Sequence, residues 1–195
     1  MRLFVALSPP ADVVDAVLAA RAPGPRHTSD LRWTHPSDWH LTLVFLGEVP
    51  DGSLPALADV LGAVAGDHAP FDLTVDGWGV FPRSGPSAVL WSGIGGDTEA
   101  LASLAADLRA AAVSTGLPGQ DRAYVPHLTV ARSRPPRDLT DLRSVLGRGP
   151  HHPWPAREVR LIESRPGRED RYRTARTWAL GWKTDPGISP ERSTA

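Results

Sequence analysis

The chain alternates between short apolar runs typical of buried strands and longer stretches whose apolar residues fall on one face of a helix. The run from Leu3 to Leu7 has the first pattern, and Leu101, Leu104 and Leu108 have the second. Expected strands cover residues 3–7, 39–46, 71–80, 88–94, 127–131, 157–163 and 175–182. Expected helices cover residues 9–22, 53–65, 97–116 and 139–146. Strands and helices therefore follow one another along most of the chain.

The order of these elements repeats. His40 lies 36 positions after Phe4 and His127 lies 37 positions after Leu90, and each interval contains a strand, a helix, a loop and a strand. Each interval ends on nearly the same tetrapeptide, HLTL at 40–43 and HLTV at 127–130. The simplest explanation is a duplicated β-α-β unit, which gives two pseudo-symmetric lobes with one tetrapeptide each.

Side chains on a strand alternate between its two faces, so His40 and Thr42 share one face, as do His127 and Thr129. If the lobes pack about a pseudo-twofold axis, these two pairs face each other across a cleft that fits a phosphate. The hydroxyls would donate to its non-bridging oxygens. Histidine has an ordinary pKa of about 6.5, so one neutral and one protonated imidazole can exchange the protons of a phosphodiester cleavage without a metal.

Composition limits the other possibilities. The chain has 195 residues, of which 41% are apolar. This is enough for one compact bilobal domain, which we expect over residues 1–183. Residues 184–195 are polar and contain proline, and we expect them to be disordered. With 21 basic and 22 acidic residues the net charge is −1, which excludes a binder held to polyanions by an overall positive field. The absence of cysteine excludes disulfides, thiolate metal sites and a cysteine nucleophile.

Location and cofactors can also be predicted. No stretch approaches the roughly 20 apolar residues of a membrane span, and residues 1–10 do not form a signal peptide, so we expect a cytoplasmic protein without membrane contact. We expect no metal and no other cofactor. A zinc site needs at least three protein ligands, whereas each tetrapeptide offers one imidazole and no further ligand on the same strand face.

Two His-x-Thr-x motifs in a duplicated chain resemble the 2H phosphoesterase superfamily, and within it the bacterial RNA 2′,3′-cyclic phosphodiesterases, also called 2′-5′ RNA ligases. The resemblance extends from Arg2 to about Trp182. The matching segments are RLFVAL at 2–7, WHLTLVFLGEV at 39–49, GVFP at 79–82, VLW at 89–91, PHLTVAR at 126–132 and LIES at 161–164. One motif alone is weak evidence, but two motifs at this spacing and in these flanks are specific.

The resemblance implies an α+β fold with pseudo-twofold symmetry, in which two antiparallel sheets line a central cleft and helices lie outside. It implies hydrolysis of a terminal RNA 2′,3′-cyclic phosphate to a 2′-phosphomonoester. His40 would be the proton donor to the leaving 3′ oxygen, and His127 would be the proton acceptor that activates water. Thr42 and Thr129 would hold the phosphate. The pseudo-symmetric sequence by itself does not decide which histidine is acid and which is base.

Other substrate contacts are expected from position. Arg132, three residues after Thr129, is expected to contact a phosphate or a base, and Phe4 and Tyr124 are expected to stack on an RNA base because they flank the cleft strands. Contact with RNA and plain solubility are both open for the arginines in Pro- and Gly-rich loops, namely Arg83, Arg165, Arg168 and Arg171. His151 and His152 are expected in an exposed turn rather than as a ligand pair.

Alternatives to the cyclic phosphodiesterase are of two kinds. The same cleft could act on cyclic nucleotides or 2′-5′ linked oligonucleotides, or run in reverse as a 2′-5′ RNA ligase. A protein of another class would bind RNA ends without catalysis. The expected partners are RNA with 2′,3′-cyclic phosphate ends or related small phosphodiesters, and the protein is expected to be a monomer.

Overall fold

The fold was analysed in a computed structural model that describes residues 1–28, 31–83, 85–118 and 124–181. The strands are β1 (Arg2–Leu7), β2 (Arg32–Trp33), β3 (Leu41–Glu48), β4 (Phe71–Phe81), β5 (Ser87–Gly96), β6 (His127–Arg137), β7 (His151–Ala156), β8 (Glu158–Ser164) and β9 (Tyr172–Ala179). The helices are α1 (Ala11–Arg21), α2 (Pro23–His27), α3 (Leu54–Asp67), α4 (Thr98–Ser114) and α5 (Thr140–Leu146), with 3-10 turns at Pro36–Asp38 and Asp51–Ser53.

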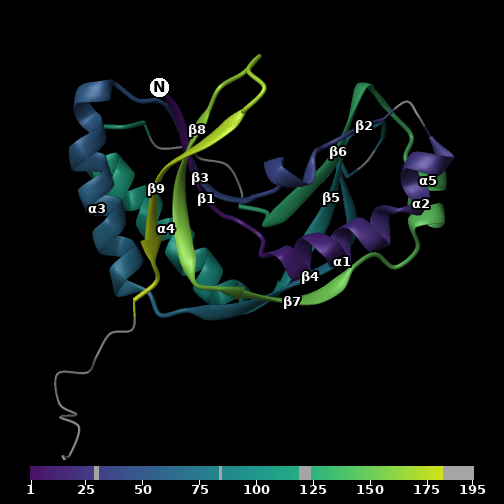
Figure 1. The fold of residues 1–195 in the computed structure, drawn as a ribbon, viewed down its shortest axis with the longest axis horizontal. Helices are drawn as coiled ribbons and strands as arrows, with labels where there is room; N and C mark the ends of the chain where they lie inside the picture. The colour runs from purple at the N-terminus through teal and green to yellow at the C-terminus, as the bar shows by residue number, and fades with distance from the viewer. Residues whose placement is uncertain (29–30, 84, 119–123, 182–195) are drawn as a thin grey trace, which may run out of the picture.

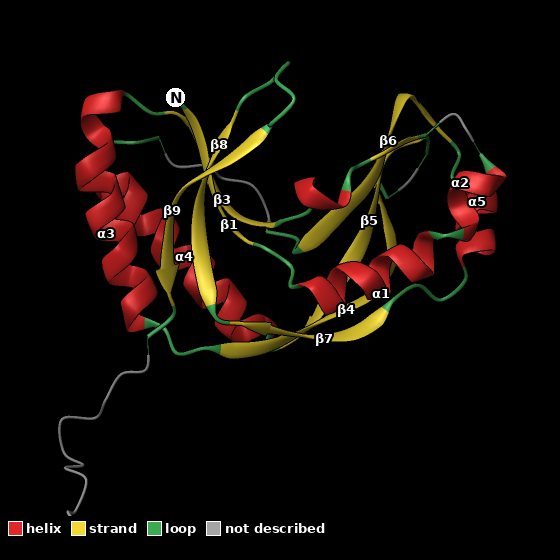
Figure 2. Cartoon of the chain, in the orientation of Figure 1, coloured by secondary structure: helices red, strands yellow, loops and turns green. Residues whose placement is uncertain are grey.

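The described strands form one antiparallel sheet in the order β7-β4-β5-β6-β3-β1-β8-β9, with β2 paired to β6. The sheet is strongly curved, and the helices lie on its outside (Figure 2). Its two halves join between β3 and β6, through the residue pair Leu41 and Leu128. The α+β fold class is confirmed, and the two predicted sheets are the halves of this one sheet.

The helices connect the halves. Helix α1 follows β1 but packs against β7 in the other half, whereas α4 follows β5 and packs against β3 (Figure 1). Each repeated strand-helix-strand unit therefore sends its helix to the opposite half of the sheet. The repeat predicted two pseudo-symmetric lobes but not this exchange, because the sequence pattern does not indicate on which half a helix will pack.

The core lies between the curved sheet and the helices α3 and α4. Leu57 and Leu61 on α3 are completely buried, and so is Leu104, which the sequence pattern placed on the apolar face of α4. Burial of one such side chain stabilises the fold by about 1.5–3 kcal/mol. Asp97 caps the N-terminus of α4, since its carboxylate accepts a 3.0 Å hydrogen bond from the backbone N–H of Ala100.

The segment 151–156 differs from its prediction. His151 and His152 lie in β7, an edge strand paired with β4, and not in a turn. Proline is tolerated on edge strands, and buried Trp154 anchors this one to the core. Each histidine meets a carboxylate, Asp76 at 3.2 Å from His151 and Asp12 at 3.3 Å from His152.

Three short elements, α2, β2 and β7, were not predicted. The strand expected at 175–182 is found at Tyr172–Ala179. The disorder predicted for residues 184–195 lies outside the described residues. None of the helices in the described ranges is both long and apolar enough to cross a bilayer.

Candidate active site

The two motifs lie where the halves of the sheet join. Leu41 and Leu128, the residues that directly follow the two histidines, pair across this junction and are completely buried. The histidines and threonines therefore point to the opposite face, as the alternation of side chains predicts. The structure brings both pairs together around one cavity of about 100 Å³, lined by Thr34, Asp38, His40, Thr42, Phe45, His127, Thr129, Arg132, Arg171 and Tyr172.

Each imidazole is held by a hydrogen bond of the same kind, from its Nδ1 to the backbone carbonyl two residues earlier. Nδ1 of His40 lies 2.7 Å from the carbonyl oxygen of Asp38, and Nδ1 of His127 lies 2.7 Å from that of Val125. A carbonyl oxygen can only accept, so Nδ1 is the protonated nitrogen in each ring. Nε2 is then the unprotonated nitrogen of each neutral ring. The pseudo-symmetry thus extends to the tautomer of each histidine.

Aromatic rings pack around both imidazoles. The ring of His40 lies between Phe4, at 4.7 Å between centroids, and Tyr172, at 5.0 Å. The ring of His127 contacts Phe81 at 5.0 Å and Trp91 at 6.0 Å. These contacts restrict rotation of the imidazoles and displace water from them.

This apolar packing shifts the proton equilibria. Burial lowers the pKa of His40 to about 4, although the hydrogen bond to the Asp38 carbonyl and the Asp38 carboxylate act in the opposite direction. Burial also lowers the pKa of His127, and the charge of Arg132 lowers it further. Both rings are therefore neutral at pH 7 in the free protein. A bound phosphate anion would raise both pKa values, because a nearby negative charge stabilises an imidazolium.

Phe4 and Tyr124, the residues predicted to stack on an RNA base, are both packed inside the protein. The side chain of Phe4 is only 3% exposed and packs against His40, which leaves it little surface for a base. Tyr124 packs against the main core, and its hydroxyl is buried without a hydrogen-bond partner. It is absent from the described residues that line the cavity, so this position does not support base stacking. Arg132 lines the cavity as expected.

An exposed aromatic residue lies at the cavity instead. Phe45 is 56% exposed and lines the site. Strict alternation from Thr42 would place Val44, and not Phe45, in the cleft. The pairing of β3 with β1 shifts register between Val44 and Thr42, so that Leu43 and Val44 are both buried and Phe45 turns into the cleft. Such bulges often redirect a side chain near an active site, and a single sequence carries no clear signal of them.

A hydrogen-bonded bridge connects the two motifs. The hydroxyl of Thr34 lies 2.7 Å from the carbonyl oxygen of Val130 and 3.0 Å from that of Thr129. The same hydroxyl accepts a 2.8 Å hydrogen bond from the indole N–H of Trp39, the residue before His40. Thr34 thus ties the start of the first motif to the strand that carries the second. Nothing in the local sequence around Thr34 indicated this role.

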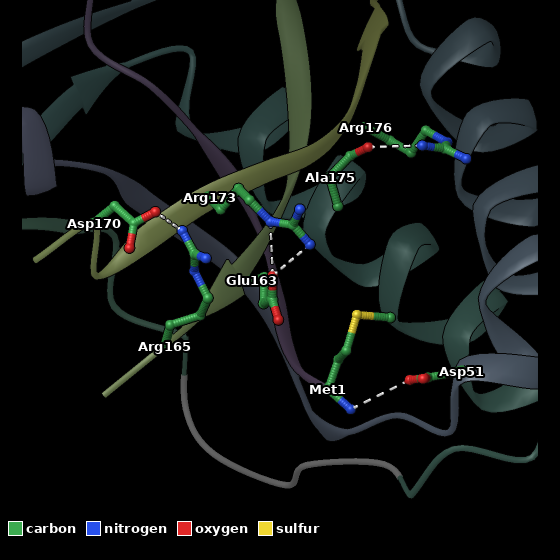
Figure 3. Close-up of polar contacts among 8 residues, drawn as sticks. All are labelled: Met1, Asp51, Glu163, Arg165, Asp170, Arg173, Ala175 and Arg176. Atoms are coloured by element: carbon green, nitrogen blue, oxygen red, sulfur yellow. Dashed lines mark hydrogen bonds and ion pairs between the residues drawn. The ribbon is translucent and has the colours of Figure 1, made fainter. Parts of the chain in front are cut away.

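The hairpin between β8 and β9 supplies Tyr172 and Arg171, which the sequence did not identify as neighbours of the histidines. Ion pairs brace the hairpin, with Arg173 Nε 2.9 Å from a carboxylate oxygen of Glu163, and Arg165 bonded to Asp170 (Figure 3). A backbone hydrogen bond of 2.7 Å from Arg165 N–H to the carbonyl of Arg171 closes the loop.

Within the ranges that the structure describes, His, Asp and Glu side chains do not gather in a group of three or more that could hold a metal ion.

Comparison with known proteins gives consistent relationships. Residues 9–168 match the model of the 2′-5′ RNA ligase superfamily. The chain is 30% identical to the RNA 2′,3′-cyclic phosphodiesterase of Escherichia coli over 92% of this chain and 96% of that protein. It is 38% identical to the protein of the same name from Geobacillus stearothermophilus, but that alignment spans 51% of this chain and only 32% of the relative. A crystal structure from Thermus thermophilus superposes with a TM-score of 0.76 at 29% identity, covering 92% of this chain and 98% of the other.

Proposed function

Because the chain belongs to the 2′-5′ RNA ligase superfamily, we propose that it hydrolyses the terminal 2′,3′-cyclic phosphate of RNA to a 2′-phosphomonoester. The observation that carries the proposal is the matched pair of imidazoles, each with Nδ1 bound to a carbonyl, across a cavity lined by two threonines. The relatives named as RNA 2′,3′-cyclic phosphodiesterases support the choice of substrate.

In the proposed reaction a water molecule attacks the phosphorus of the cyclic phosphate. Nε2 of His127 takes a proton from this water as the new P–O bond forms. The bond between phosphorus and the 3′ oxygen breaks, and Nε2 of His40 donates a proton to that oxygen. The product carries a 2′-phosphate and a free 3′-hydroxyl. A proton then passes from His127 to His40 through solvent, which restores the starting state.

The remaining groups of the cavity stabilise charge. The hydroxyls of Thr42 and Thr129 donate hydrogen bonds to the non-bridging oxygens of the phosphate, and the Arg132 guanidinium compensates the charge of the transition state. His40 must carry a proton to act as the acid although its pKa in the free protein is about 4. The anionic substrate itself supplies the charge that raises this pKa when it binds.

A product assay tests the proposal. An oligonucleotide ending in a 2′,3′-cyclic phosphate should yield only the 2′-phosphate, at the same rate with and without a chelator of divalent metals. A 2′,3′-cyclic mononucleotide, a 2′-5′ linked dinucleotide and a pair of RNA ends suitable for ligation serve as competing substrates. A 3′-phosphate product, or faster turnover of the 2′-5′ linkage, would reject the proposal in favour of another activity of the same cleft. Binding without turnover at any pH would indicate a non-catalytic RNA-end binder.

A further inference from the structure

The catalytic cavity opens into a larger cleft of about 1190 Å³, and the two share six lining residues: Asp38, His40, Phe45, Arg132, Arg171 and Tyr172. The guanidinium groups that line the cleft are those of Arg2, Arg32, Arg132, Arg134, Arg168 and Arg171. Among the described residues, only two carboxylates line it, those of Asp38 and Glu169. The whole chain carries a net charge of −1, so this concentration of positive charge is local.

Some of these arginines lie so close together that their positive charges repel one another. Arg32 on β2 lies directly opposite Arg132 on β6, and like charges at such positions destabilise a strand pair. Arg134 lies on the same face of β6 as Arg132, because the residue between them is buried. Partial burial lowers the pKa of Arg132, and three neighbouring guanidiniums lower it further: Arg171, Arg134 and Arg32.

Carboxylates do not neutralise this group. In the part of the chain that the structure describes, no ion pair joins Arg32, Arg132 or Arg134 to an acidic side chain. On the neighbouring hairpin, by contrast, Arg165 and Arg173 each have a carboxylate partner (Figure 3). The Nε of Arg171 is buried and has no hydrogen-bond partner. An anionic ligand in the cleft would relieve the repulsion among these guanidiniums.

The volumes of the two cavities indicate how a substrate would lie. The catalytic cavity, at about 100 Å³, has room for a phosphate but not for a nucleoside. A cyclic phosphate occupies the 3′ end of an RNA, so all the rest of the chain extends in the 5′ direction. The nucleoside and the preceding phosphates must therefore enter the arginine-lined cleft. Phe45, exposed at the boundary of the two cavities, offers a flat apolar surface on which a base can stack.

We propose that the arginine-lined cleft binds the RNA chain on the 5′ side of the cyclic phosphate, with Arg32, Arg134 and Arg171 on internucleotide phosphates and Phe45 against a base. This inference rests on the proposed function and extends it, because it makes a polynucleotide the preferred substrate over a mononucleotide. It also explains why Phe45 and the opposed pair Arg32 and Arg132 occupy otherwise unfavourable positions.

The test compares kcat/KM for a tetranucleotide and a mononucleotide, both ending in a 2′,3′-cyclic phosphate. The wild-type protein is expected to prefer the tetranucleotide by at least about 10-fold, and the double variant R32Q/R134Q is expected to reduce this preference to about 3-fold or less. The salt dependence of tetranucleotide binding should weaken as well, by about 0.7 in logarithmic slope for each phosphate that the variant no longer neutralises. Arg109→Gln, on the exposed face of α4, is the matched control and should keep both the preference and the slope.

Folding is measured separately. Removing one of two opposed like charges relieves repulsion, so the melting temperature of R32Q/R134Q is expected to equal or exceed that of the wild type.

Phe45→Ala should weaken tetranucleotide binding by about 5- to 100-fold, the range expected for one stacked base. Val113→Ala replaces another exposed apolar side chain, 45% exposed on α4, and should leave binding unchanged.

Binding of a labelled tetranucleotide that ends in a 2′-phosphate separates this proposal from the catalytic one. If no cyclic substrate is hydrolysed but binding depends on chain length and falls in R32Q/R134Q, the proposed activity fails and the RNA-binding cleft stands. If the wild type treats both lengths alike, or the double variant keeps the full preference, the cleft does not bind the RNA chain. Equal competition by free tripolyphosphate and by the tetranucleotide would likewise overturn it.

Discussion

The two imidazoles of the site combine a fixed tautomer with an unusually low affinity for protons. The carbonyls of Asp38 and Val125 hold Nδ1–H in each ring, and aromatic packing removes the water that would stabilise an imidazolium. The free site is therefore neutral, and in the proposed reaction the acid forms only with the substrate anion in place. Binding and protonation are coupled through a charge that the protein itself does not supply.

This coupling predicts proton uptake on ligand binding. NMR titration of the His40 ring should give a pKa of about 4 in the free protein and a clearly higher value with inorganic phosphate bound. Calorimetry in buffers of different ionisation enthalpy should record the proton taken up. If the pKa of His40 is the same with and without phosphate, protonation and phosphate binding are not coupled.

The low pKa of His40 also predicts how stability depends on pH. The folded-state pKa of about 4 lies below the ordinary value of 6.5, so the unfolded chain binds a proton at this residue first as the pH falls. The contribution of His40 to stability is therefore lost as the pH falls from about 6.5 to 4. Between pH 7 and pH 5, urea unfolding should show the wild type losing on the order of 1–2 kcal/mol more than His40→Gln. Parallel losses in the two proteins would show that the pKa of His40 is not depressed.

At the scale of the elements, the strands β3 and β6 set the geometry of the site. Their single joining pair places the motifs face to face, the bulge in β3 turns Phe45 into the cleft, and Thr34 ties the loop before His40 to the strand after His127. The alternation of His40 and Thr42 could be predicted because it depends only on neighbouring residues. The bulge, the Thr34 bridge and the approach of Tyr172 depend on pairing between distant segments, which local patterns do not encode.

Substitution of Thr34 tests the bridge. Thr34→Val removes the hydroxyl that contacts Val130 and leaves the indole N–H of Trp39 without its acceptor, at a cost of about 1–3 kcal/mol in the free energy of unfolding. We expect kcat to fall about 10-fold while KM changes little, since the motifs lose their alignment but keep their phosphate-binding groups. Thr34→Ser restores the hydroxyl and should recover most of kcat.

Thr177→Val, at an exposed position of β9, is the matched control for the same change of side chain. A loss of stability in Thr34→Val with unchanged kcat would show that the bridge is only structural.

At the scale of the molecule, the two halves of the sheet are interlocked by the exchange of α1 and α4. The repeat of HLTL and HLTV predicted both the pseudo-symmetry and the meeting of His40, Thr42, His127 and Thr129, which line one cavity in the structure. The same repeat could not predict the exchange of helices, since each helix carries an apolar face that either half could cover. The positively charged cleft could not be predicted from the sequence either. Its arginines come from segments that lie far apart in the chain, and the net charge of the whole chain is nearly zero.

The most direct test of the acid–base pair is single-turnover hydrolysis of a 2′,3′-cyclic-ended RNA by the wild type, His40→Ala and His127→Ala. Each variant should be slower by about 10²- to 10⁴-fold, and each should lose the opposite limb of the pH–rate profile. His151→Ala, which removes an exposed histidine from β7, should match the wild type. If either His40→Ala or His127→Ala retains the wild-type rate, the two histidines do not form the catalytic pair.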